Sequence, residues 1–122
     1  MPTVLIVDDH AGVRFAVRER FESSLTSIVC TEAENGADAI VMAQKRKPDL
    51  IVLDLSMPVM DGFEAAKALR RLFPAIPIVM LTAHYMETTK QAALLAGIPE
   101  VFSKHQDLSP LIAHARVLFG MR

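Results

Sequence analysis

An α/β fold with five parallel strands and five helices is the fold class that this sequence predicts. Five short runs rich in β-branched residues lack the polar alternation of half-exposed strands, which is typical of strands buried on both faces of a parallel sheet. Between these runs, apolar residues recur at helical spacing. Right-handed crossovers between parallel strands place helices on both faces of such a sheet. The five runs are Val4–Val7, Ser27–Cys30, Leu50–Leu53, Ile76–Leu81 and Val101–Phe102.

The first three helices follow from apolar spacing and from residues that begin or end helices. The second helix follows Asn35 and Gly36 and directs Ile40 and Ala43 inward. Pro74 ends the third helix, because proline cannot continue the helical hydrogen-bond ladder. The inward residues of the first helix are Val13, Val17, Phe21 and Leu25, and those of the third are Phe63, Ala66, Leu69 and Phe73.

The last two helices have clear boundary signals. The fourth is expected from Glu87 to Ala96, with Gly97 ending it. The fifth is expected to begin at Ser109 as N-cap, with Pro110 at the first helical position. Its core-facing stripe consists of Leu108, Leu111, Ile112, Ala115, Leu118 and Phe119.

Composition limits the class of protein. The 122 residues suit one domain, spanning residues 1–122, and 52% of them are hydrophobic. A net charge of −1 supplies no field that attracts phosphate backbones, so this domain alone is not expected to bind nucleic acid. Cys30 is the single cysteine, which excludes an intrachain disulfide. No apolar run reaches the roughly 18 residues of a membrane span, and the N-terminus lacks signal-peptide character, so a cytoplasmic location is expected.

Polar residues gather where the predicted strands end. Asp8 and Asp9 follow the first strand, Asp54 the third, Thr82 the fourth and Lys104 the fifth. The carboxyl ends of parallel strands share one edge of a sheet, where ligand sites of such folds lie. We therefore expect three carboxylates, a hydroxyl and an ammonium to converge there.

This set of groups indicates phosphoryl transfer. Carboxylate oxygens suit Mg²⁺, whereas zinc would require imidazole or thiolate ligands. Lys104 and Thr82 add hydrogen-bond donors for an anion with several oxygens. Asp54, at the centre, would be the nucleophile that forms an acyl phosphate. His10 is expected to be a loop or capping residue rather than a metal ligand.

The stretch LDLSMPVMDG at residues 53–62, with VDD before it and LTA and a lysine after it, resembles the receiver domain of bacterial two-component response regulators. The resemblance covers essentially the whole chain in order and spacing. It implies a flavodoxin-like, CheY-like sheet of order 2-1-3-4-5. The stretch DDH is similar to receivers of the NarL/FixJ-type subgroup, which carry helix-turn-helix output domains. A C-terminal DNA-binding domain missing from this sequence is therefore one alternative, and a single-domain regulator is the other.

The resemblance assigns roles to individual residues. Asp54 becomes the phosphoacceptor, Asp9 a direct Mg²⁺ ligand and Asp8 the holder of a metal-bound water. The backbone carbonyl of Ser56 would be the third protein ligand, beside Asp9 and Asp54.

Further roles concern the phosphoryl group. Thr82 matches the switch hydroxyl, Ala83 the small residue that leaves room for the phosphoryl group, and Lys104 the lysine that pairs with it. Ser56 and His84 match positions that tune the lifetime of the phosphoryl group.

Two positions depart from the family pattern. Val101 stands where many receivers have Tyr or Phe, and strand alternation should point Phe102 to the opposite face. Movement of Thr82 is then expected to be relayed with less side-chain rearrangement or through another contact, to which Tyr85 could contribute. His105 replaces the proline that commonly follows the lysine, which leaves the cis or trans state of the Lys104–His105 bond open.

The sequence thus predicts a receiver that takes a phosphoryl group from a histidine kinase or phosphotransfer protein onto Asp54. It would be a regulatory phosphoacceptor, with slow self-catalysed phosphorylation and dephosphorylation, rather than an enzyme. The resemblance implies an output surface that comprises the fourth helix, fifth strand and fifth helix, a face through which receivers of this family commonly form a homodimer or contact a partner. Two alternatives stay open: a pseudo-receiver that works without phosphorylation, and a Mg²⁺-dependent aspartyl phosphatase. The second usually has another Asp where Ser56 stands.

Overall fold

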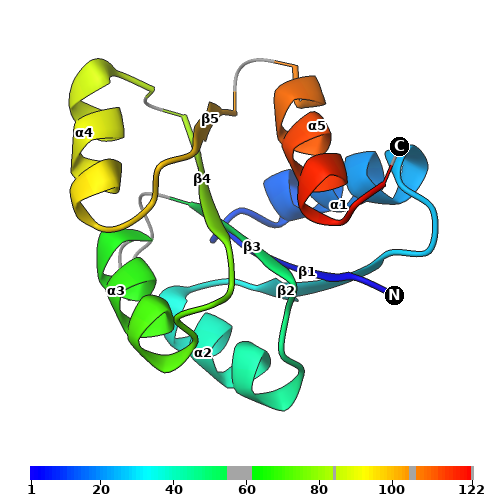
Figure 1. The fold of residues 1–122 in the computed structure, drawn as a ribbon, viewed down its shortest axis with the longest axis horizontal. Helices are drawn as coiled ribbons and strands as arrows, with labels where there is room; N and C mark the ends of the chain where they lie inside the picture. Colours follow the sequence, from blue (N-terminus) through cyan, green and yellow to red (C-terminus); the bar gives the residue numbers. More distant parts are fainter. Residues whose placement is uncertain (55–61, 84, 105–106, 122) are drawn as a thin grey trace.

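The computed structural model describes residues 1–54, 62–83, 85–104 and 107–121. Within this part of the chain, strands and helices alternate, and the strands form one parallel sheet of order β2-β1-β3-β4-β5 (Figure 1). The strands are β1 (Thr3–Val7), β2 (Val29–Ala33), β3 (Leu50–Asp54), β4 (Ile78–Thr82) and β5 (Val101–Ser103). The helices are α1 (Ala11–Ser24), α2 (Gly36–Lys45), α3 (Gly62–Leu72), α4 (Glu87–Leu95) and α5 (Ser109–Leu118). The predicted fold class and strand order are confirmed.

Side chains of alternating strand residues form two separate hydrophobic cores, one on each face of the sheet. The helices α2, α3 and α4 lie on one side of the sheet and α1 and α5 on the other (Figure 1). Leu5, Ile51 and Met80 belong to the core on the first side, and Ile6 and Val79 to the core on the second. All these side chains are almost fully buried. Each contributes about 1.5–3 kcal/mol to stability through removal of apolar surface from water. The sheet is therefore a rigid layer whose edges have fixed positions.

Helices approach the sheet closely where their inner faces carry alanine. Ala39 and Ala43 of α2 and Ala65 and Ala66 of α3 are all completely buried. A larger side chain at these positions would have to displace strand residues, because cores of this density leave few voids. On the opposite face of the sheet, the large side chain of Phe21 in α1 is fully buried in the core.

Side chains of the N-cap residues cap the starts of α1 and α2. The Nδ1 atom of His10 accepts a hydrogen bond from the backbone N–H of Val13 at 3.3 Å, so His10 is a capping residue, as predicted. Asn35 caps α2 by accepting from the N–H of Asp38 at 2.8 Å. Gly97 follows α4 with φ of +84°, a conformation that favours glycine, and thereby ends the helix.

Some predicted boundaries are wrong. The second strand runs from Val29 to Ala33 rather than from Ser27 to Cys30, and Ser27 has φ of +57°, outside the extended region. Because β2 is an edge strand, Thr31 and Glu32 are half-exposed and polar. The strand therefore lacks the continuous apolar run on which the prediction is based. The fourth strand likewise occupies residues 78–82 rather than 76–81.

The start and end of the fifth helix also differ from expectation. The N-cap is Leu108, and Ser109 and Pro110 form the first helical positions. The backbone N–H of Ser109 donates to the Asp107 carboxylate at 2.9 Å, which supplies the capping interaction from one residue earlier. Leu118 is 40% exposed, because the chain turns after it and Phe119 packs on the core instead.

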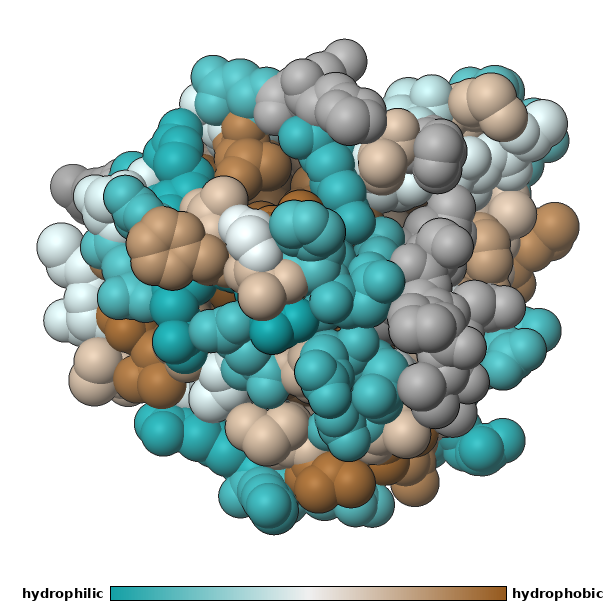
Figure 2. All heavy atoms as spheres, turned by 180° about the vertical axis from the view of Figure 1, so that it is seen from behind, coloured by the Kyte–Doolittle hydropathy of each residue, from teal (hydrophilic) through white to brown (hydrophobic). Residues whose placement is uncertain are grey.

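Within the described residues, no helix combines the length and apolar character that crossing a bilayer requires. On the face opposite to that of Figure 1, hydrophilic side chains predominate and hydrophobic ones form separate small patches (Figure 2).

The single cysteine allows a test of the core. Burial, reinforced by the nearby Glu22 carboxylate, raises the pKa of the Cys30 thiol to about 11. The reactive thiolate is therefore about 100-fold scarcer below pH 9 than in the unfolded chain. We predict that iodoacetamide alkylates native protein at least that much more slowly than urea-unfolded protein at pH 8, as followed by intact mass. Equal rates for the two states at pH 8 would contradict the burial of Cys30.

Candidate functional site

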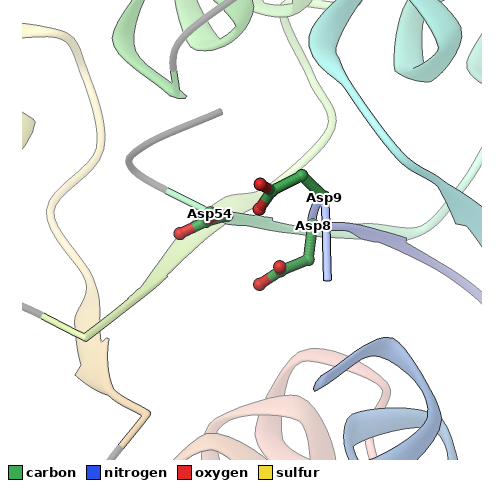
Figure 3. Close-up of side chains that lie close together, drawn as sticks. All are labelled: Asp8, Asp9 and Asp54. Atoms are coloured by element: carbon green, nitrogen blue, oxygen red, sulfur yellow. The ribbon is translucent and has the colours of Figure 1, made fainter. Parts of the chain in front are cut away.

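Three carboxylates meet at the carboxyl edge of the sheet. Asp8 and Asp9 follow β1, and Asp54 is the last residue of β3. The strands are parallel neighbours with Val7 opposite Leu53, so Asp8 and Asp54 extend from adjacent strand ends (Figure 3). One carboxylate oxygen from each of the three residues lies within 4.8 Å of the others. The convergence expected from the strand ends is present.

The surroundings of the acidic pair differ. Asp8 is 3% exposed and Asp9 is exposed. The backbone N–H of Asp8 donates to the carbonyl of Ala33 at 3.1 Å, and its Oδ1 accepts from the N–H of His10 at 2.9 Å. Asp8 is therefore anchored by backbone on two sides, while Asp9 extends into solvent beside Asp54.

Lys104 links two of these carboxylates. Its Nζ lies 2.6 Å from Asp8 Oδ2 and 2.9 Å from Asp54 Oδ1. Burial by itself opposes the charged ammonium, but hydrogen bonds and attraction from both carboxylates outweigh it, so the pKa of Lys104 lies above its ordinary value. Lys104 is thus positively charged at neutral pH, and three carboxylates face one ammonium.

Backbone pairing places Lys104 and Thr82 at this edge. The N–H of Lys104 donates to the carbonyl of Thr82 at 2.8 Å, which extends the β4–β5 ladder by one residue. Thr82 is 1% exposed and follows Leu81, the residue paired with Asp54. Ala83 comes next in the chain. Three other sequence candidates, Ser56, His84 and His105, lie outside the described residues, and so does the Lys104–His105 bond.

Val101 and Phe102 point to opposite faces, as strand alternation predicts. Val101 packs against the core on the α2–α4 side, and Phe102 against the core on the α1–α5 side. The Phe102 ring lies 5.8 Å from the ring of His114 on α5. Tyr85 is 45% exposed and lines, together with Val101 and Phe102, a hollow of about 100 Å³.

Two residues at this edge were not predicted from the sequence. Arg14 Nη1 donates to the backbone carbonyl of Asp8 at 2.7 Å, and Arg14 Nε lies 2.9 Å from Glu32 Oε1. Glu32 lies near the carboxyl end of β2, and no site residue was predicted from the sequence in that strand. The available signal was that Glu32 is an acidic residue at the same edge as the other strand ends.

The acidic cluster fits a small hard cation. Three carboxylates whose oxygens lie within 4.8 Å of one another are close enough to contribute, directly or through a coordinated water, to one octahedral Mg²⁺ site. Three carboxylates and one ammonium retain two negative charges, which a divalent cation would balance. The ligand atoms of the described cluster are all carboxylate oxygens.

Known proteins are similar to this chain in sequence and in fold. The model of the response regulator receiver domain matches residues 4–116. The KDP operon transcriptional regulatory protein KdpE of Escherichia coli K12 is 38% identical over 117 residues, which cover 96% of this chain and 51% of KdpE. The chain spans about half the length of the curated relatives it matches.

Solved structures agree with the sequence match. Chemotaxis protein CheY4 of Vibrio cholerae has a TM-score of 0.87 and 31% identity, covering 97% of this chain and 98% of its own. Response regulator TrrA of Thermotoga maritima has a TM-score of 0.85 and 26% identity, covering 97% and 99%. A LuxR-family response regulator from Aurantimonas is also similar, with a TM-score of 0.86, 28% identity and coverage of 98% and 86%. The chain therefore belongs to the response regulator receiver domain family of two-component signal-transduction systems.

Proposed function

We propose that residues 1–122 form one receiver domain that accepts a phosphoryl group on Asp54 from a histidine kinase or phosphotransfer protein in the cytoplasm. The observation that carries this proposal is the position of Asp54, a carboxylate 5% exposed that lies beside the acidic pair and 2.9 Å from the Lys104 ammonium. The structure of TrrA is of a complex with Mg²⁺-BeF, which supports the same chemistry at a similar fold.

The cation-binding residues would be Asp9, Asp54 and the backbone carbonyl of Ser56, with Asp8 holding a coordinated water. Bound Mg²⁺ would offset the negative charge that gathers between Asp54 and the incoming phosphoryl group. The donor set supports this assignment, because every described member supplies oxygen.

The covalent step takes place at Asp54. One carboxylate oxygen forms a bond to phosphorus as the phosphorus–nitrogen bond to the donor histidine breaks, and the imidazole leaves with the bonding electrons. Lys104 and Thr82 would donate hydrogen bonds to the phosphoryl oxygens, and Ala83 would leave room for them. Ser56 and His84 would control how fast water hydrolyses the acyl phosphate, which returns the carboxylate and inorganic phosphate.

Phosphorylation is favoured over the two alternative functions. A pseudo-receiver has no need to keep Asp8, Asp54 and Lys104 in mutual contact in a nearly buried site. An aspartyl phosphatase of the usual type needs a second aspartate two residues after the nucleophile, and Ser56 occupies that position.

A direct test uses intact mass after incubation with Mg²⁺ and acetyl phosphate. Native protein should gain one phosphoryl group, and Asp54→Asn should gain none because the amide is not a nucleophile at neutral pH. Addition of EDTA should prevent the gain. The matched control is Asp49→Asn, which removes a carboxylate just before the opposite end of β3 and should leave phosphorylation unchanged.

Two results would contradict the receiver function: a native protein that gains no phosphoryl group, or an Asp54→Asn variant that still gains one. Rapid turnover of varied phosphoesters would favour the phosphatase instead.

Signal relay would use Tyr85 in place of the usual aromatic residue at the Val101 position. Tyr85 stands at the hollow beside Val101, and it is the only tyrosine in a chain without tryptophan. Its fluorescence therefore reports on one site. We predict that Mg²⁺ and beryllofluoride reduce quenching of Tyr85 by acrylamide, because the ring moves into the hollow.

The variant Val101→Phe tests the same relay without adding a tyrosine. It restores an aromatic residue at the position where many receivers have Tyr or Phe, so the relay should no longer depend on Tyr85 and beryllofluoride should leave Tyr85 quenching unchanged. If native protein also shows no change although Asp54 is phosphorylated, or if Phe102 becomes exposed instead, the relay does not pass through Tyr85.

The output surface would comprise α4, β5 and α5, and its occupant would be a second copy of the chain. Leu94 and Leu95 of α4 are 62% and 90% exposed, an unusual exposure for two adjacent leucines. With a net charge of −1, the domain alone is not suited to nucleic acid.

We predict that phosphorylation shifts the native chain from monomer to dimer in sedimentation experiments, and that Leu95→Glu abolishes this shift because it places a charge in the interface. The control Leu72→Glu alters an exposed leucine at the end of α3 and should dimerise normally. A Leu95→Glu variant that still dimerises would place the interface elsewhere.

A further inference from the structure

Two arginines on one face of α1 share a single carboxylate. Arg14 Nε lies 2.9 Å from Glu32 Oε1, and Arg18 Nη1 lies 3.0 Å from Glu32 Oε2. The arginines are four residues apart, so they stand one helical turn from each other over β2. Both pairs are partly buried, and the Arg14 side chain is only 16% exposed.

The two arginines differ in what else they contact. Arg18 donates to the backbone carbonyl of Cys30 in β2 and pairs with Glu22 on its own helix. Arg14 donates instead to the carbonyl of Asp8 at 2.7 Å. Arg18 therefore ties α1 to β2, whereas Arg14 connects Glu32 to the acidic cluster.

The carbonyl that Arg14 holds belongs to the peptide bond between Asp8 and Asp9. Because a peptide unit is planar, fixing this oxygen also fixes the orientation of the Asp9 N–H and the position of the Asp9 Cα atom, from which the side chain extends. Asp8 has other anchors in Ala33, His10 and Lys104, but Asp9 is exposed. The position of the Asp9 carboxylate thus depends on the backbone that Arg14 restrains.

We propose that Arg14 is a positioning residue that orients the acidic pair for the divalent cation, and that Glu32 holds the Arg14 guanidinium in place. This inference rests on the proposed function, since it concerns the same cation site. Glu32 also balances the Arg14 charge, so that the guanidinium orients the peptide with little repulsion of the cation. Arginine suits the task, because its planar fork binds a carboxylate and a carbonyl at once.

The test is calorimetric titration of Mg²⁺ into the full chain without a phosphodonor. Partners that orient metal ligands typically change affinity by 10–100-fold, so Arg14→Gln should weaken Mg²⁺ binding by about tenfold or more. Arg14→Lys should fall between native and Arg14→Gln, because an ammonium cannot satisfy both partners in the same geometry. Glu32→Gln should also weaken binding, since it loosens the guanidinium and leaves its charge unbalanced.

Arg18→Gln is the matched control. It removes the other partner of Glu32 and the contact with Cys30, so it should lower the melting temperature of metal-free protein, yet its dissociation constant for Mg²⁺ should equal that of native protein. A weakening confined to the Arg14 and Glu32 variants supports the positioning role.

Three outcomes separate the possible failures. If Arg14→Gln binds Mg²⁺ as tightly as native protein, or if Arg18→Gln weakens binding equally, the positioning role is overturned while the proposed function stands. If native protein binds no Mg²⁺, the proposed function itself fails. If Arg14→Gln does not fold, the nearly isosteric variant Glu32→Gln tests the positioning role instead. An affinity of that variant for Mg²⁺ equal to that of native protein overturns the inference.

Discussion

Repulsion among three carboxylates at the edge of the sheet is the constraint on which the rest of the site depends. Two unit charges 4 Å apart near a protein surface repel each other by about 4 kcal/mol, which is large against the stability of a small domain. Lys104 offsets part of this repulsion through its contacts with Asp8 and Asp54. The carboxylates keep Lys104 protonated, and under the proposed function a divalent cation would offset the remaining negative charge.

Charges of opposite sign alternate outward from this cluster. The ammonium of Lys104 faces the carboxylates from the side of β5, and the guanidinium of Arg14 supports the Asp8 backbone from the side of α1. The Glu32 carboxylate then balances the positive charge of Arg14, and Arg18 balances the negative charge of Glu32. Each charge has a partner in the next layer, so the arrangement holds an acidic site without leaving an isolated buried charge nearby.

The apolar sheet makes this arrangement possible, because the central strands β1, β3 and β4 are buried along their whole length and their ends cannot shift independently. Under the proposed function, a change at Asp54 would therefore be transmitted through side chains at the edge of the sheet. Val101 is too small to act as an aromatic switch, and Phe102 is held in the other core beside His114. Tyr85 remains as the aromatic side chain with both exposure and an adjoining hollow.

The sequence by itself determined the fold class and most of the acidic edge, because buried parallel strands are continuous apolar runs and the residues that follow them share one edge. Asp8, Asp9, Asp54, Thr82 and Lys104 could be read in this way. The bounds of the edge strand β2 could not be predicted in this way. Its exposed side carries the polar residues Thr31 and Glu32, which interrupt the apolar run. Only the tertiary structure decided that Arg14 contacts both Glu32 and the Asp8 carbonyl. The contact with Glu32 joins residues 18 positions apart, and it depends on the packing of α1 against β2. Local patterns record how each segment folds, whereas a charged pair between segments depends on which of them become neighbours.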